Sequence, residues 1–206
     1  MRYRIILAVL TCLLGLTPVL ADETPNERQA KRIFDQAYQQ VFGEEGATLH
    51  YDVNIIGLYK TSGTIWFKGK KSKFVDAKTN SWNDGTTIYT VRKKKPGVVE
   101  IHNAQNNKSD KFSGKFKFAA GNYTYHIESA DEGLLLTLKA KKGAKGIKEL
   151  HLLVKRGTYE PIRLRAKVAF IWANVKISDF KSGGITDETL RFPSEKYQNC
   201  KYVDKR

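Results

Sequence analysis

The chain has 206 residues, 41% of them hydrophobic, and 36 Lys and Arg against 21 Asp and Glu give it a net charge of +15. This length fits one domain with a sizeable core, and no repeat, proline-rich linker or shift of composition marks a second domain. Beyond residue 21 no apolar run approaches the ~20 residues that a membrane-spanning helix needs, which excludes a membrane-embedded mature protein.

Residues 1–21 have the pattern of a cleaved secretory signal peptide. Arg2 and Arg4 precede an apolar run at 5–16, which a proline follows before the small residues of the expected cleavage site. The mature domain is therefore expected to comprise residues 22–206 and to lie outside the cytoplasm.

The strong positive charge suggests an acidic partner, and that partner has to be one that an exported protein can meet. Removal of the leader lowers the net charge only to +13, because it carries two arginines and no acid. Export argues against nucleic acid, and the basic residues are spread along the chain instead of forming one arm. Two interpretations stay open: a solvated outer surface, or attraction to acidic lipid head groups or acidic partner proteins.

Cysteine usage leaves the fold without a disulfide. After cleavage Cys200 is the single cysteine, so the domain has to be held together by its core. Cys200 is expected to be a buried or half-buried spectator thiol. Cys12 resembles a lipid-acylation site only in part, since Thr11 stands where Gly or Ala would be needed.

The first predicted element of the mature chain is a helix that begins after Thr24. Pro25 at the first helical position and Glu27 complete a capping-box pattern. Apolar residues then recur at the three-and-four spacing of one helical stripe: Ala30, Ile33, Phe34, Ala37, Tyr38, Val41 and Phe42. Gly43 is expected to end the helix in the left-handed conformation.

From Ala47 the apolar period changes to two, which predicts strands almost to the C-terminus. The predicted strands are 47–55, 63–68, 72–77, 86–92, 98–102, 122–129, 134–140, 147–154, 162–169 and 171–180. Turn residues such as Asp84-Gly85 separate them, and the short links indicate an antiparallel meander. Residues 103–121 are either a loop with buried phenylalanines or a short helical cover.

Each predicted strand carries one apolar face, and together these faces exceed what one helix can cover. Sheets of this size twist strongly and tend to curl or split. We therefore predict an α+β fold, an antiparallel unclosed β-barrel of about ten or eleven strands whose concave apolar face is covered by the N-terminal helix. An apolar cavity would lie between them, and the alternative is a filled β-sandwich without a cavity.

Four stretches follow one another in an order that resembles a known family. They are Gly63-Thr64-Ile65-Trp66-Phe67-Lys68 with Lys73-Phe74, then Asp84-Gly85-Thr86-Thr87-Ile88-Tyr89, then Tyr159-Glu160-Pro161-Ile162, and finally Leu190-Arg191-Phe192, Tyr197 and Tyr202-Val203-Asp204-Lys205-Arg206. Their order across residues 24–206 resembles the LolA-like periplasmic carriers of outer-membrane lipoproteins. The resemblance implies an unclosed barrel with a helical lid over an apolar cavity, and a closing phenylalanine strand near Phe192.

The chain departs from this family in three places. Lys68-Gly69-Lys70-Lys71 holds no arginine where the family places one that latches the lid, and Thr86 stands where the family's hairpin has lysine. The segment between His102 and Asn122 is also shorter than the family's mid-chain cover, which puts the latch and the closure of the cavity in doubt.

The resemblance implies a carrier that binds lipoprotein acyl chains and uses no cofactor, metal or catalytic group. The expected cavity lining is Leu49, Tyr51, Val53, Ile65, Trp66, Phe67, Phe74, Trp82, Tyr89, Tyr125 and Leu136, and the expected lid residues are Ile33, Phe34, Ala37, Tyr38 and Val41. For Trp82 and Tyr89 ordinary cross-strand packing is the alternative.

Partners follow from the same resemblance. They are acylated lipoproteins, an inner-membrane complex that releases them, an outer-membrane acceptor and anionic lipid head groups, with no nucleic acid and a monomeric chain. Two other functions stay open: a module on the same scaffold that senses lipid or lipoprotein, and an envelope hydrolase. The hydrolase would need a polar constellation, and His50, His102, His126 and His151 fall on separate strands.

Overall fold

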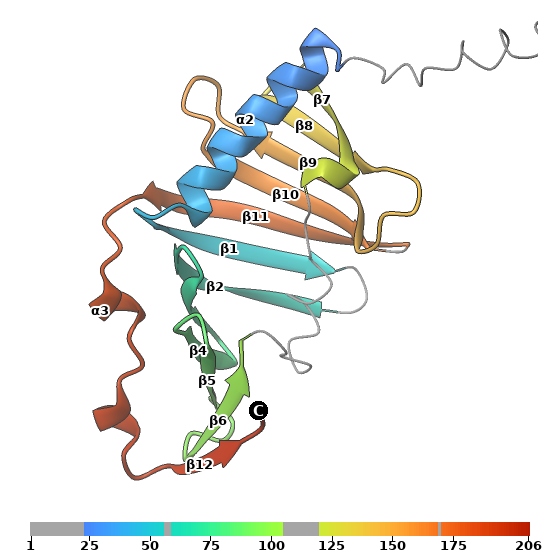
Figure 1. Ribbon diagram of the computed structural model, residues 1–206. Coiled ribbons are helices and arrows are strands. Elements are labelled where there is room, and N and C mark those ends of the chain that lie inside the picture. The colour runs from blue at the N-terminus through green and yellow to red at the C-terminus, as the bar shows by residue number, and fades with distance from the viewer. Residues whose placement is uncertain (1–22, 56–58, 105–119, 169) are drawn as a thin grey trace, which may run out of the picture.

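A twelve-stranded sheet and one long helix make up most of the protein in the computed structural model, which describes residues 23–55, 59–104, 120–168 and 170–206 (Figure 1). The predicted signal peptide, Cys12 and residues 105–119 lie outside the described residues. No helix among the described residues is long and apolar enough to cross a membrane.

Most strands follow one another along the chain without a helix between them. The helices are α2 Pro25–Phe42, η2 Ala120–Asn122, α3 Asp187–Leu190 and η3 Ser194–Tyr197. The strands are β1 Ala47–Ile55, β2 Tyr59–Lys68, β3 Lys71–Asp76, β4 Thr79–Asn83, β5 Thr87–Arg92, β6 Val98–Asn103, β7 Tyr123–Ala130, β8 Gly133–Ala140, β9 Ile147–Val154, β10 Pro161–Val168, β11 Ile171–Ser182 and β12 Lys201–Asp204.

The sheet is open and almost wholly antiparallel. Its strand order is β12-β6-β5-β4-β3-β2-β1-β11-β10-β9-β8-β7, so β7 and β12 are its edges and β1 pairs with β11 at its centre. Only β12 runs parallel to its neighbour, β6. The predicted α+β class, the unclosed sheet and the N-terminal helix packed on it are confirmed, with twelve strands in place of ten or eleven.

The helix begins as its sequence predicts and ends differently. Thr24 Oγ1 accepts a hydrogen bond from the Glu27 amide at 3.1 Å, which satisfies one of the unpaired amides of the first turn. Gly43 has φ −69°, so the prediction of a left-handed stop was wrong. A glycine is still needed there, because a Cβ would lie 2.4 Å from the Gln39 carbonyl oxygen.

The first turn of α2 caps the open edge of the sheet. The Asn26 side-chain amide donates to the Ile127 carbonyl at 2.8 Å and its oxygen accepts from the Ile127 amide at 3.0 Å. Glu27 Oε1 accepts from the amide of Tyr125, also on β7. Side chains thus take the place of a further strand, which matters because unpaired edges invite pairing with other chains.

Two separate cores hold this sheet, one on each face. On the face that carries α2, called here the inner face, buried helix residues pack against β7 to β10: Ala30, Ile33, Phe34, Ala37, Tyr123, Tyr125, Ile127, Leu136, Leu138, Ile147, Leu150, Leu152, Val154 and Ala166. On the outer face, Trp82, Val91 and Val99 pack with Tyr197 and Phe192 of the C-terminal segment.

The C-terminal segment, residues 183–206, covers the far half of the sheet. Figure 1 shows it leaving β11, passing α3 and reaching β6 at the opposite end. The strand expected at 190–192 was wrong: Leu190 ends the short helix α3, and Phe192 stacks on Tyr89 with ring centroids 4.4 Å apart. Strand β4, also absent from the predicted strands, was hidden in a short polar run, Thr79–Asn83, without apolar alternation.

Glu100 fastens this segment to β6 by charge. Lys205 Nζ lies 2.9 Å and an Arg92 guanidinium nitrogen 3.3 Å from its carboxylate oxygens. Burial alone would raise the pKa of Glu100, but the hydrogen bonds and charges of Lys205 and Arg92 outweigh it and lower the pKa to about 2.

We expect Asn26→Ala to lower the free energy of unfolding by about 1–3 kcal/mol, because it removes both partners of Ile127 on the edge strand. Thermal unfolding followed by circular dichroism measures the change. Gln29→Ala, at an exposed position one turn further along α2, is the matched control and should leave the midpoint unchanged. Equal midpoints for the two variants would contradict the edge-capping role.

A second prediction concerns acid. Since the pKa of Glu100 is about 2 in the folded chain against an ordinary 4.5, its contribution to stability is complete above about pH 4.5 and is lost as the pH falls toward 2. The loss is about 3 kcal/mol at most. Denaturant unfolding between pH 6 and pH 2.5 should show a shallower decline for Glu100→Gln than for the native chain, and parallel curves would refute the assignment.

Candidate functional site

The inner face carries a set of aromatic and aliphatic side chains beyond the buried core of α2. We call this set the inner apolar face; it comprises Tyr38 and Phe42 of α2 with Leu49, Tyr51, Val53, Ile65, Phe67 and Phe74 of β1, β2 and β3. Registers place the strand residues on one side of the sheet, since Leu49 is opposite Ile65 and Ile65 is opposite Phe74.

Ring contacts join the helix to the sheet within this set. Phe42 meets Phe67 edge to face at 4.8 Å between centroids, and Tyr38 lies 4.8 Å from Phe42. Further along the face, Tyr51 stacks on Phe74 at 5.4 Å. The arrangement is a band of rings that runs from the last turn of α2 to β3.

The band is incompletely covered, in contrast to the core beside it. Tyr38 is 44% exposed and Phe42 is 38% exposed, whereas Ile33 and Ala37 one turn earlier are almost fully buried. Ile65, Phe67 and Phe74 are half-buried, whereas Leu49 and Tyr51 of β1 are each only 6% exposed. The exposed parts of Tyr38 and Phe42 make this end of the band the candidate binding surface.

The structure divides the predicted lining residues between the two faces. Leu49, Tyr51, Val53, Ile65, Phe67 and Phe74 lie together on the inner apolar face. Tyr125 and Leu136 lie on the same face of the sheet, but they are buried under α2 in the core. Of the predicted lid residues, Ile33, Phe34 and Ala37 belong to that core, Val41 is half-buried and Tyr38 is exposed.

Trp66, Trp82 and Tyr89 lie on the outer face. Trp66 is opposite Lys73, Lys73 is opposite Trp82, and Trp82 is opposite Tyr89, so the row lies on the side away from α2. Trp82 is 5% exposed and meets Phe192 edge to face. These three residues therefore lie on the opposite face from Phe67 and Phe74, and the rings of Trp82 and Tyr89 pack against Phe192 of the C-terminal segment.

Phe42 and the C-terminal aromatics are what sequence reasoning missed. Phe42 was counted in the helical stripe but not among the site residues, and its place at the last turn was the available signal. Nothing local in the sequence indicated that Phe192 and Tyr197 return to cover Trp82, because that contact joins segments more than a hundred residues apart.

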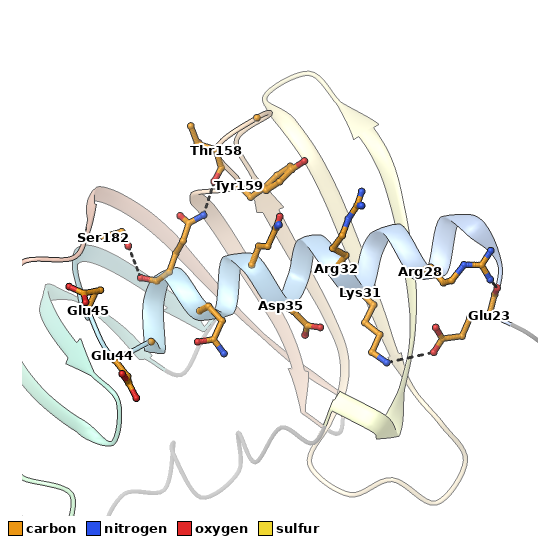
Figure 2. Close-up of a pocket in the computed structure, with 15 residues that line it drawn as sticks. Glu23, Arg28, Lys31, Arg32, Asp35, Glu44, Glu45, Thr158, Tyr159 and Ser182 are labelled. Carbon is orange, nitrogen blue, oxygen red and sulfur yellow. Dashed lines mark hydrogen bonds and ion pairs between the residues drawn. The ribbon is translucent and has the colours of Figure 1, made fainter.

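Two hollows in the described part of the chain have charged residues in their linings. A hollow of about 1090 Å³ follows the solvent side of α2, where Figure 2 shows Lys31 facing Glu23. A smaller one of about 480 Å³ lies under the C-terminal segment beside Trp82, with Asp187 at its rim. Neither of these two hollows includes a residue of the inner apolar face.

The last turn of α2 is tied down by two hydrogen bonds that Figure 2 shows. Gln40 Nε2 donates to the Thr158 carbonyl at 2.7 Å, and Ser182 Oγ donates to the Gln40 carbonyl at 3.2 Å. Both bonds are exposed. This end of the helix is therefore held by weaker contacts than the middle turns, whose side chains from Ala30 to Ala37 lie in the buried core.

Electrostatics change along the inner face. Under α2, burial and the nearby Asp35 carboxylate raise the pKa of Tyr125 to about 12, and its hydroxyl donates to the Ala120 carbonyl at 3.0 Å. At β6 the same face is charged: Glu100 lies 3.4 Å from the buried His102 ring. An apolar band thus passes into an ion-paired end.

Within the described ranges no group of three or more His, Cys, Asp or Glu side chains is placed to hold a metal ion. The histidines lie apart: His50 is beside Thr64, His102 beside Glu100, and His151 donates or accepts at 2.7 Å with Glu149. Cys200 is half-buried and contacts the Pro96 carbonyl.

The fold belongs to a class of open antiparallel sheets with one helix laid across a face, and solved structures share it. An uncharacterised conserved protein from Thermus thermophilus is similar at a TM-score of 0.59, with 12% identity over 86% of this chain and 99% of its own. MucB is similar at 0.51, with 10% identity over 82% of this chain and 64% of MucB. No family model and no curated protein matches the sequence.

A LolA superfamily protein from Nitrosomonas europaea reaches a TM-score of 0.40, with 12% identity over 79% of this chain and 97% of its own. A likeness of that size carries no argument, and the identities to the other two structures establish a shared fold alone. Membership of the LolA-like family therefore stays a prediction.

Proposed function

We propose that this protein is a non-catalytic carrier that binds the acyl chains of lipoproteins on its inner apolar face. The observation that supports the proposal is the partial exposure of Phe42, Phe67 and Phe74 on the inner face, which a filled sandwich core would cover. The apolar band suits hydrocarbon, and the ion-paired end at Glu100 suits the polar part of the same cargo.

The energetics explain why such a surface is useful. Each buried methylene contributes ~0.8 kcal/mol, so a sixteen-carbon chain gains roughly 12 kcal/mol on leaving water. Passage through an aqueous compartment without a carrier is then prohibitive. Transfer needs no chemistry, only an affinity that lies between those of the donor and the acceptor.

Residues 1–21 are proposed to be a signal peptide that sends the domain of residues 22–206 to the periplasm. Cargo would then come from an inner-membrane release complex and pass to an outer-membrane acceptor, with the chain acting as a monomer. The loading step would use the last turn of α2 as the moving part, because the turns before it hold Ala30, Ile33, Phe34 and Ala37 in the buried core.

A second function, a sensor of lipid or lipoprotein, is favoured by a different observation. MucB, whose fold this chain shares, is known in a complex with MucA of Pseudomonas aeruginosa. A sensor would bind a membrane regulator tightly and would not move acyl chains between membranes. A donor-to-acceptor vesicle assay with a fluorescent lipopeptide separates the two functions.

The carrier proposal is tested with two neighbouring aromatic residues on opposite faces of β2. Phe67→Ser should weaken binding of a diacylated lipopeptide by about tenfold or more, because a full aromatic side chain leaves the site. Trp66→Ser is the matched control: Trp66 is also half-buried, but it packs under Lys73 on the outer face and should keep its affinity. Displacement of a fluorescent acyl probe measures both.

Two results would refute the proposal. One is equal loss of affinity in Phe67→Ser and Trp66→Ser, which would make the effect one of stability. The other is native mass spectrometry that finds neither copurified lipid nor bound acylated peptide in the intact native chain.

Movement of the last helical turn predicts faster loading when its exposed ties are cut. Gln40→Ala removes the bond to Thr158, which is worth about 0.5–1.5 kcal/mol, so uptake of the acyl probe should quicken about two- to tenfold. Stopped-flow fluorescence measures the rate. Gln36→Ala, an exposed position one turn earlier, is the control, and unchanged rates in Gln40→Ala would argue that the helix does not move.

A further inference from the structure

The hairpin that joins β10 and β11 carries an apolar tip that the fold leaves uncovered. Phe170 is 85% exposed, about twice the exposure of Tyr38, and Ile171 beside it is 37% exposed. Trp172 follows as the first half-buried residue of β11. Three large apolar residues in sequence at a turn contribute nothing to either core.

Cations surround this tip within its own hairpin. The Arg165 guanidinium lies 4.8 Å and the Lys167 ammonium 5.7 Å from the centroid of the Trp172 ring. His151 also faces the ring, at 5.2 Å between centroids. Tryptophan has an apolar ring with a polar N–H group and is enriched at the boundary between membrane and water. The two cations beside Trp172 suit the same boundary.

A second basic segment lies at the same end of the sheet. Strands β8 to β11 alternate in direction, so the loop between β8 and β9 and the hairpin between β10 and β11 lie at the same end of these strands, called here the docking edge. Figure 1 shows both on the same side. Exposed lysines crowd that loop and its flanks: Lys139, Lys141, Lys142, Lys145 and Lys148.

The one acid of this segment does not cancel the charge. In the cross-strand register Glu149 stands between Lys139 and Lys167, and its carboxylate is bound to His151 at 2.7 Å. The hydrogen bond from His151 and the nearby lysines lower the pKa of Glu149, so it stays ionised and paired. The edge as a whole keeps a large positive excess.

We propose that this edge docks the protein on an anionic bilayer, with Phe170 and Ile171 entering the head-group region and the β8–β9 lysines binding acidic head groups. Apolar anchor, interfacial tryptophan and clustered lysines are the three features that peripheral membrane binding combines. The proposal goes beyond the carrier function, because it uses no residue of the inner apolar face and needs no cargo.

The test is cosedimentation of the mature chain with vesicles of phosphatidylcholine, alone or in equal parts with phosphatidylglycerol. The native chain should bind only the anionic vesicles. Phe170→Ser should weaken that binding about tenfold, as expected for one lost aromatic anchor, while Tyr202→Ser, at an exposed tyrosine on β12, should leave it unchanged.

A second part of the experiment compares two double variants that each replace two lysines by glutamates. Lys142→Glu with Lys145→Glu should abolish binding, whereas Lys94→Glu with Lys95→Glu, in the turn between β5 and β6, should reduce it only slightly. Equal losses in the two double variants would show an effect of net charge alone and would overturn the proposal. The proposal would also be overturned if the native chain bound both vesicle types equally. The same holds if Phe170→Ser bound anionic vesicles as strongly as the native chain does.

Two readouts keep the outcomes distinct. Phe170→Ser should retain its circular dichroism spectrum, since the side chain packs on nothing, and should bind the acyl probe as the native chain does. Phe170→Trp should bind the anionic vesicles and shift its emission to the blue only with them. Failure of membrane binding with intact probe binding would refute the docking edge and leave the carrier function standing.

Discussion

A mismatch of dimensions governs this protein, because its sheet is far wider than its helix is long. Twelve strands at their usual spacing span about 53 Å, whereas an 18-residue helix extends about 27 Å. One helix therefore buries its core residues against four of the twelve strands, β7 to β10, and only its last turn reaches β2. The rest of the sheet is left to another layer. The chain supplies that layer from its C-terminus, and on the opposite face.

The change of face produces the candidate site. Where the helix core ends and the outer core has not yet begun, β1, β2 and β3 present Ile65, Phe67 and Phe74 to the inner side with only partial cover. Had the C-terminal segment packed on the inner side, these rings would have been core. The site is thus a consequence of how two layers divide one sheet, and it lies beside the loosely tied last turn of α2.

The two proposed surfaces use opposite chemistry and different ends of the molecule. The inner apolar face is a band of rings that borders an ion-paired end at Glu100. The docking edge is a field of lysines around one apolar tip at Phe170. A carrier needs both, a surface that shields hydrocarbon from water and a means to approach a membrane, and separate sites allow the cargo to stay covered while the protein docks.

The sequence by itself determined the local elements, because their signals are local: the capping box at Thr24, the period-two strands and the Asp84-Gly85 turn each act within a few residues. Strand alternation also sets the relative sides of neighbouring residues, and the predicted lining, which included both Trp66 and Phe67, did not follow it. Only the tertiary structure decided that Trp82 faces away from α2, because alternation is the same whichever side a distant segment covers. Trp82 is covered by Phe192, which lies 110 residues further along the chain, and no local sequence pattern predicts that contact.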